Sequence, residues 1–157
     1  MITIQVETVI EAPIEKCFDL ARSLSTHVAT TGSSRERIVS RHGRDLLELG
    51  DEVTFEAFHL GVRQRLASRI VEFERPAFFV DQMLKGAFRF LRHLHEFEEM
   101  PEGSTKMVDT LDFESPFGPI GWVVDRIFLR RYMTRFIRRR GNALKKVAEH
   151  LKPFRTE

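Results

Sequence analysis

The side chains in this sequence with the clearest capacity for chemistry are two histidines, His93 and His95, separated by a single residue. They lie in a stretch, Phe88–Glu98, that we expect to be a β-strand, and residues two apart on a strand project to the same face. Asp81 and Asp109 lie on the neighbouring predicted strands, where cross-strand pairing brings their carboxylates to that face. The sequence therefore predicts a group of imidazoles and carboxylates on one face of a sheet.

Four interpretations of this group stay open. The imidazoles and carboxylates can satisfy each other's hydrogen bonds inside an apolar sheet, as buried polar groups usually do, or they can contact a bound ligand. A carboxylate-oriented imidazole can also act as a general acid or base, and His93 and Asp109 are then the candidate catalytic residues. Two histidines and a carboxylate can bind zinc. We favour mutual hydrogen bonding and ligand contact over catalysis, and we expect neither a metal nor a cofactor.

Turn signals divide the middle of the chain into the strands that would position these side chains. The signals are Leu60-Gly61, Arg75-Pro76, Gly86 and the cluster Pro101–Gly103. From about Ile38 onward the turn signals therefore predict a continuous antiparallel meander. It is preceded at the N-terminus by one strand in which apolar and polar residues alternate. The predicted strands with clear bounds are Ile2–Ile10, Asp51–His59, Val62–Glu74, Ala77–Lys85, Phe88–Glu98 and Ser104–Ser115.

Helical segments lie before and after the meander. Pro13 suits the first turn of a short helix, and the polar stretch Ser23–Arg37 allows at most one more. After the meander the pattern becomes helical and continues to about Leu151. The apolar stripe changes sides near Phe128–Arg130, so we expect a break there, with the part from Ile120 forming a separate cap over one end of the sheet. The predicted order is β-α-α-β-meander-α, which belongs to the α+β class.

Pairing the strands through their turns predicts which side chains face inward. The turn after His59 sets Phe55 opposite Leu66, and the last turn of the meander sets His93 opposite Asp109. The resulting face is mostly apolar with a few polar groups, which is typical of a ligand pocket. The predicted ligand-contacting residues are Phe55, His59, Gln64, Leu66, Asp81, Met83, Leu91, His93, His95, Met107, Asp109, Leu111 and, from the last helix, Met133.

Length and composition indicate a single globular domain spanning residues 1–157. A hydrophobic share of 42% and a charged share of 31% argue against disorder. The single cysteine, Cys17, fits a reducing compartment, and charged residues interrupt every apolar run before the roughly 20 residues needed to span a bilayer. We therefore expect a soluble, cytoplasmic protein that is a monomer or a homodimer.

Basic residues crowd the predicted C-terminal helix although the net charge of the chain is only +2. Such a run can bind nucleic acid or an anionic membrane surface, but we interpret it as a solvated helix face. We expect no nucleic-acid partner, and peripheral membrane contact is the weaker alternative. The run consists of Arg126, Arg130, Arg131, Arg135, Arg138, Arg139, Arg140, Lys145 and Lys146.

Several segments together resemble a known superfamily. The opening strand-to-helix sequence is IEAPIEKCFDLA, and it is followed in order by GDEVTFEAFHLG, RIVEFERPAFFVDQMLKGAFRFLRHLHEF, GSTKMVDTLDFESPFGPIG and VDRIFLRRYM. The opening resembles the SRPBCC superfamily, the START-like or birch-pollen-allergen-like proteins. The ordered series, which covers almost the whole chain, resembles its bacterial subgroup of ligand-binding or cyclase/dehydrase-like proteins.

The resemblance implies the helix-grip fold, in which a seven-stranded curved antiparallel sheet wraps around a long C-terminal helix with a cavity between them. The superfamily includes lipid carriers, aromatic polyketide cyclases and other binders, so the fold alone does not assign an activity. It implies a protein that binds a small hydrophobic or amphipathic ligand, lipid-like or aromatic. The alternative is an enzyme of the polyketide cyclase/dehydratase type that uses a His/Asp pair in the cavity.

Overall fold

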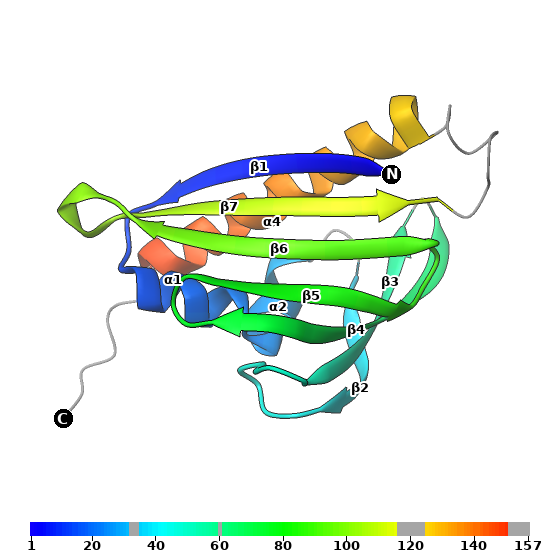
Figure 1. The fold of residues 1–157 in the computed structure, drawn as a ribbon, viewed down its shortest axis with the longest axis horizontal. Coiled ribbons are helices and arrows are strands. Elements are labelled where there is room, and N and C mark those ends of the chain that lie inside the picture. The colour runs from blue at the N-terminus through cyan, green and yellow to red at the C-terminus, as the bar shows by residue number, and fades with distance from the viewer. Residues whose placement is uncertain (32–34, 60, 116–124, 151–157) are drawn as a thin grey trace.

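The computed structural model describes residues 1–31, 35–59, 61–115 and 125–150, which form a curved antiparallel sheet with helices on one side of it (Figure 1). The α+β class and the predicted element order are confirmed. In chain order the elements are β1 (Ile2–Ile10), α1 (Ile14–Ala21), α2 (Leu24–Thr30), β2 (Arg37–His42), β3 (Glu52–His59), β4 (Val62–Glu74), β5 (Phe78–Lys85), β6 (Phe90–Glu99), the 3-10 turn η2 (Pro101–Gly103), β7 (Thr105–Glu114), the π-helical turn η3 (Asp125–Leu129) and α4 (Arg130–His150).

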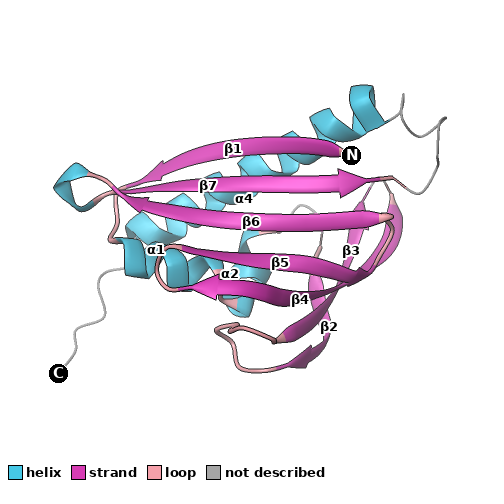
Figure 2. Cartoon of the chain, in the orientation of Figure 1, coloured by secondary structure: helices cyan, strands magenta, loops and turns pink. Residues whose placement is uncertain are grey.

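The sheet has seven strands in the order β1-β7-β6-β5-β4-β3-β2. Strands β2 to β7 form a meander of hairpins, whereas β1 reaches the far edge by pairing with β7. Figure 2 shows the long helix α4 running along the β1 and β7 side of the sheet, while α1 lies near the ends of β6 and β7 and α2 lies on the β4 and β5 side. The concave face is therefore closed by helices from two places in the sequence.

Two apolar clusters hold the helices to the sheet. In the first, the ring of Phe18 from α1 meets Phe73, Phe79 and Phe97 edge-on, with ring centroids 5.3–5.5 Å apart. In the second, α4 packs Met133 and Ile137 against the sheet. The sheet residues of the second cluster are Ile4, Val6, Leu91, Leu111 and Phe113. The space between the two clusters is where a cavity can form.

The predicted pairing is confirmed in the middle of the sheet and is wrong at its last hairpin. Phe55 pairs with Leu66 as expected, but His93 pairs with Leu111 and not with Asp109. The cause is the turn η2, which is centred one residue later than predicted because Glu102 adopts a left-handed conformation with φ 66°. Because the centre of the turn lies one residue later than predicted, each residue of β6 pairs with a residue of β7 that lies two positions later than predicted. A shift of two positions leaves every side chain on the face of the sheet that the sequence predicted.

The last helix changes type where the sequence predicted a break. The π-helical turn η3 ends at Leu129 and α4 begins at Arg130. Much of the predicted cap, from Ile120 to Val124, lies outside the described residues. Among the helices that the structure describes, none combines the length and the hydropathy that crossing a bilayer would require.

Candidate ligand-binding site

A cavity of about 410 Å³ lies between the concave face of the sheet and the helices. Its walls come from α2 and the neighbouring loops, from strands β3 to β7, and from η3 and α4. Most of the lining is aliphatic or aromatic because the inward positions of alternating strands are apolar here. The apolar lining residues include Val53, Phe55, Ala57, Leu66, Ile70, Leu91, Leu111, Leu129, Met133, Phe136 and Ile137.

Most of the residues that the sequence assigned to ligand contact line this cavity. They are Phe55, His59, Gln64, Leu66, Asp81, Leu91, His93, His95, Leu111 and Met133. The structure places Met83, Met107 and Asp109 away from this lining. Met83 packs at the edge of the second apolar cluster, while Met107 and Asp109 lie behind the histidines, around a much smaller void next to α4. Asp109 therefore faces the imidazoles and not the main cavity.

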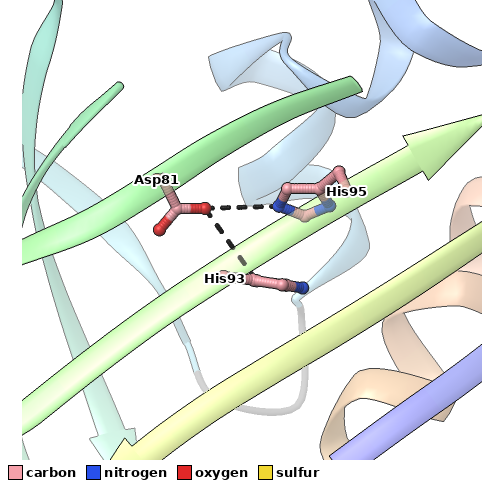
Figure 3. Close-up of side chains that lie close together, drawn as sticks. All are labelled: Asp81, His93 and His95. Atoms are coloured by element: carbon pink, nitrogen blue, oxygen red, sulfur yellow. Dashed lines mark hydrogen bonds and ion pairs between the residues drawn. The ribbon is translucent and has the colours of Figure 1, made fainter. Parts of the chain in front are cut away.

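The histidine–aspartate cluster, formed by Asp81, His93, His95 and Asp109, is assembled by three adjacent strands. Asp81 on β5 pairs with His93 on β6, and His95 on β6 pairs with Asp109 on β7. Because these positions alternate along their strands, all four side chains project to the concave face. The rings of His93 and His95 lie 3.8 Å apart between centroids. Figure 3 shows Asp81 directed toward both rings from the neighbouring strand.

Each histidine of the cluster lies between two carboxylates. Oδ1 of Asp109 lies 3.0 Å from Nε2 of His93 and 2.7 Å from Nδ1 of His95. On the other side, Oδ2 of Asp81 lies 3.2 Å from Nε2 of His95 and 3.9 Å from Nδ1 of His93. Asp109 thus contacts both rings closely, whereas Asp81 contacts one ring closely and leaves space beside the other.

The two histidines of the cluster differ in their affinity for protons. Burial lowers the pKa of His93, the charge of His95 lowers it further, and the hydrogen bond to Asp109 does not restore it. Burial also acts to lower the pKa of His95, but hydrogen bonds to Asp109 and Asp81 outweigh it and raise that pKa above its usual value. Hydrogen bonds from the imidazoles hold the pKa of Asp109 far below its usual range, against the effect of burial. His95 is therefore the more easily protonated of the two rings, and when neutral His93 donates from Nε2 to Asp109, its Nδ1 is an acceptor.

Sequence reasoning missed a second polar group in the wall, contributed by α2, α4 and the segment before β2. His27 lies 3.0 Å from Glu36, and its ring stacks on Phe55 with centroids 4.3 Å apart. Arg140 of α4 also lines the cavity, and its charge acts on Glu36, His27 and Asp81. The interpretation of the basic run as a solvated face is therefore wrong for Arg140, although Arg138 and Arg139 are exposed.

A third polar contact lies where β3 ends and α4 begins. Nδ1 of His59 lies 2.8 Å from the hydroxyl oxygen of Tyr132, and the His59 ring also meets Phe136 edge-on at 5.2 Å. Tyr132, Phe136 and Arg140 were not among the predicted site residues. These three residues are spaced four apart, so they lie on one face of the helix, next to Met133, which the sequence had already assigned to the cavity. This spacing could have identified them.

Comparison with solved structures finds the same fold in proteins of low sequence identity. TTHA0849 from Thermus thermophilus is 19% identical with a TM-score of 0.77, and the match covers 92% of this chain and 95% of that one. The ZhuI aromatase/cyclase from Streptomyces is 14% identical, with a TM-score of 0.76 and coverage of 94% and 93%. A START superfamily protein from Mycobacterium smegmatis is 11% identical, with a TM-score of 0.75 and coverage of 96% and 99%.

No protein-family model matches the sequence, and a search of curated proteins finds no match either. At identities below 20% these structural matches establish the fold and not an activity. The matched structures include a START superfamily protein, an aromatase/cyclase and the plant proteins ginseng major latex-like protein and Ara h 8. The chain therefore has the helix-grip fold of the START-like SRPBCC superfamily that the sequence resembles.

Proposed function

We propose that the protein binds a small hydrophobic or amphipathic molecule in the cavity between the sheet and α4. The observation that carries this proposal is the cavity itself, whose volume of about 410 Å³ falls within the usual range for small-molecule sites. A cavity of this size inside a domain of 157 residues leaves apolar side chains without packing partners. A bound apolar molecule would restore those contacts.

The arrangement of polar groups supports an amphipathic or aromatic ligand over a purely aliphatic one. The histidine–aspartate cluster and Arg140 place charge on one part of the wall, and the His59–Tyr132 contact places hydrogen-bonding groups on another. Buried polar groups cost free energy unless they are paired, so a ligand with matching oxygen or nitrogen atoms would bind more tightly than a hydrocarbon.

Filling the cavity tests this proposal. Ala57 is buried in the cavity wall on β3, and Ala57→Phe would place a ring in the space that the ligand needs. The probe is 8-anilinonaphthalene-1-sulfonate, whose fluorescence rises in apolar sites. The wild type should bind the probe, and Ala57→Phe should weaken binding at least about tenfold.

The matched control is Ala67→Phe on β4. Ala67 is not part of the cavity lining and lies next to Leu66, so its side chain projects to the opposite face of the sheet. This variant should bind the probe like the wild type. Absence of probe binding by the folded wild type, or equal binding by Ala57→Phe, would contradict the proposed function.

A second candidate function is catalysis of the cyclase/dehydratase type, favoured by one specific observation. His93 lines the cavity with Nδ1 3.9 Å from Oδ2 of Asp81, and because burial lowers its pKa, its unprotonated ring could accept a proton from a bound ketone. His93 and Asp109 remain the proposed catalytic residues. Conversion of an added β-hydroxyketone to its enone, followed by absorbance, should then occur in the wild type and be lost in His93→Gln.

We also propose that the protein acts in the cytoplasm, as a monomer or homodimer. The support is that the single cysteine, Cys17, is buried as a free thiol in the first apolar cluster. Free thiols persist in reducing compartments. Fractionation of the source cells, followed by sedimentation of the purified protein, tests the compartment and the number of copies.

A further inference from the structure

We propose that Asp81, His93 and His95 form a binding site for a divalent transition-metal ion such as Zn²⁺ in the wall of the cavity. This site goes beyond the proposed binding of an apolar ligand, and the sequence alone led us to expect no metal. The three side chains point toward one another from two adjacent strands (Figure 3). Two imidazoles and one carboxylate are a ligand set that zinc accepts in proteins.

The spacing of the three ligand atoms suits a single ion. One atom from each residue can be chosen so that all lie within 4.8 Å of one another. Oδ2 of Asp81 lies 3.2 Å from Nε2 of His95 and 3.9 Å from Nδ1 of His93. Around a tetrahedral zinc ion with bonds of about 2.0–2.1 Å, ligand atoms stand roughly 3.3 Å apart. Small changes of side-chain torsion are therefore enough to seat the ion.

Asp109 orients both histidines for such a site. Its Oδ1 lies close to Nε2 of His93 and to Nδ1 of His95, so one carboxylate holds the outer nitrogen of each ring. The remaining nitrogens, Nδ1 of His93 and Nε2 of His95, are then both turned toward Asp81. A carboxylate that holds the far nitrogen of a metal-binding histidine is a regular feature of zinc sites, where it fixes the tautomer and the ring orientation.

The charges around the cluster also favour a cation. Asp109 is a buried carboxylate, Asp81 is a half-buried one, and Glu36 lies in the same wall. Arg140 is the cationic side chain of α4 whose charge acts on Asp81 and Glu36. A divalent ion between Asp81 and the two imidazoles would balance the negative charge of these carboxylates.

The position of the site gives the ion access to the ligand cavity. Asp81, His93 and His95 all line the cavity, whereas Asp109 lies behind the rings. Three protein ligands leave at least one coordination position of zinc open, as in sites where the metal contacts a small molecule. A bound ligand with a carboxylate, phenol or enol oxygen could occupy that position.

The test is titration of the full chain with zinc chloride after removal of metals with EDTA and dialysis. Isothermal titration calorimetry should show one Zn²⁺ per chain, and Co²⁺ should give the intense visible absorption of a tetrahedral site with nitrogen and oxygen ligands. Mg²⁺ should not bind because it prefers oxygen ligands and keeps its water. Zn²⁺ should also raise the melting temperature of the wild type, as a ligand of the native state does.

Variants locate the site. Asp81→Asn, His93→Gln and His95→Gln should each lose Zn²⁺ binding, and Asp109→Asn should weaken it by roughly 10- to 100-fold through the loss of ring orientation. His59→Gln, which changes a histidine in the same cavity but outside the cluster, is the matched control and should bind Zn²⁺ like the wild type.

Absence of Zn²⁺ binding by the folded wild type would overturn the metal site and leave the cluster as an internal hydrogen-bond network. Equal binding by the wild type and by all three variants, whose folding is checked by thermal melting, would also overturn it. Binding of 8-anilinonaphthalene-1-sulfonate is measured separately with metal-free protein. Failure of the metal site is therefore distinguishable from failure of ligand binding.

Discussion

His93 and His95 are separated by a single residue and their ring centroids lie 3.8 Å apart, yet burial lowers the pKa of His93 while carboxylates raise the pKa of His95. The difference comes from their contacts. His95 touches carboxylates through both ring nitrogens, whereas His93 has one close carboxylate and one at 3.9 Å. A strand that places two identical side chains on one face can therefore give them pKa values that shift in opposite directions, through their different cross-strand neighbours.

Asp109 should be the residue of the cluster on which metal-free stability depends most. Asp109→Asn removes the charge that both imidazoles contact, so we expect the free energy of unfolding to fall by about 1–3 kcal/mol. His93→Phe should cost less, because Asp109 keeps its contact with His95. Urea unfolding in the presence of EDTA measures both changes.

The control for the Asp109 variant is Asp112→Asn on the same strand. Asp112 projects to the opposite face of β7, where it accepts a hydrogen bond from Thr3 near the surface. Its replacement should change the free energy of unfolding by no more than about 0.5 kcal/mol. If Asp109→Asn cost no more than Asp112→Asn, Asp109 would not hold the cluster together.

Glu56 on β3 should account for part of the loss of folding stability at acid pH. Hydrogen bonds from Arg65 and Arg37, helped by the charge of Arg63, lower its pKa from 4.5 to about 2. The carboxylate therefore stabilises the folded state above about pH 4.5, and this stabilisation is lost as the pH falls toward 2. In Glu56→Gln the melting temperature should be lower near neutral pH and should fall less steeply between pH 4.5 and 2.

Melting curves recorded across this range of pH check the Glu56 prediction. Glu7→Gln is the matched control, because Glu7 is exposed on β1 and far from the Arg37 and Arg65 guanidinium groups. Its profile should follow that of the wild type. A Glu56→Gln profile parallel to the wild type would show that the arginines do not hold the carboxylate in solution.

At the scale of elements, the sequence determined where most strands lie, because turn residues punctuate them. The bounds of β1 and β4 were predicted without error, and the remaining predicted strands were correct to within two residues. The β6–β7 register was wrong because a non-glycine residue, Glu102, takes the left-handed conformation in the turn. Nothing in the pattern of hydrophobic residues marks such a turn.

The site was less predictable than the sheet, because it depends on how α4 crosses the strands. Alternation along β3 to β7 predicted the face of each side chain, and so most of the cavity wall. Arg140 falls on the apolar stripe of the predicted helix, but its contribution to the cavity wall could not be predicted before the helix was placed on the sheet. The shared role of Asp109 was missed because it requires the register of β6 and β7 to be known.

The crossing of α4 over β1 depends on a glycine. A Cβ atom added at Gly141 would lie 2.7 Å from Oγ1 of Thr8, which is buried on β1. Gly141→Ala should therefore lower the free energy of unfolding by about 1–3 kcal/mol through overpacking, although alanine favours helices more than glycine. Thermal or urea unfolding measures the change.

The second substitution Thr8→Ala tests the cause of that loss. It removes the oxygen that the new Cβ would meet, so the double variant Gly141→Ala with Thr8→Ala should recover part of the stability. If Gly141→Ala were as stable as the wild type, α4 would have room to shift away from the sheet. The close approach would then not be required for the fold.

At the scale of the whole molecule, the cavity lies between one curved sheet and helices that are held to it by two apolar clusters. Helix α4 contributes to both, with Leu144 and Ala148 in the first and Met133 and Ile137 in the second. Members of both clusters, such as Phe55 of the first and Leu111 of the second, also line the cavity. The polar groups on this wall come from the strands on one side and from α2 and α4 on the other. A ligand in the cavity would therefore be oriented by residues that are far apart in the sequence.

The orientation of an amphipathic ligand should depend on Arg140 and not on the neighbouring arginines. Arg140 lines the cavity, whereas Arg138 and Arg139 are exposed on the outer side of α4. Arg140→Gln should weaken binding of the anionic probe 8-anilinonaphthalene-1-sulfonate by roughly 10- to 100-fold, because a hydrogen bond to a charged group contributes about 1.5–3 kcal/mol. The double variant Arg138→Gln with Arg139→Gln should bind like the wild type.

Binding of the uncharged N-phenyl-1-naphthylamine should be the same in all of these proteins, since it has no anionic group for Arg140 to contact. An equal loss of both probes in Arg140→Gln would mean that this side chain supports the shape of the cavity and does not select the charge of its ligand.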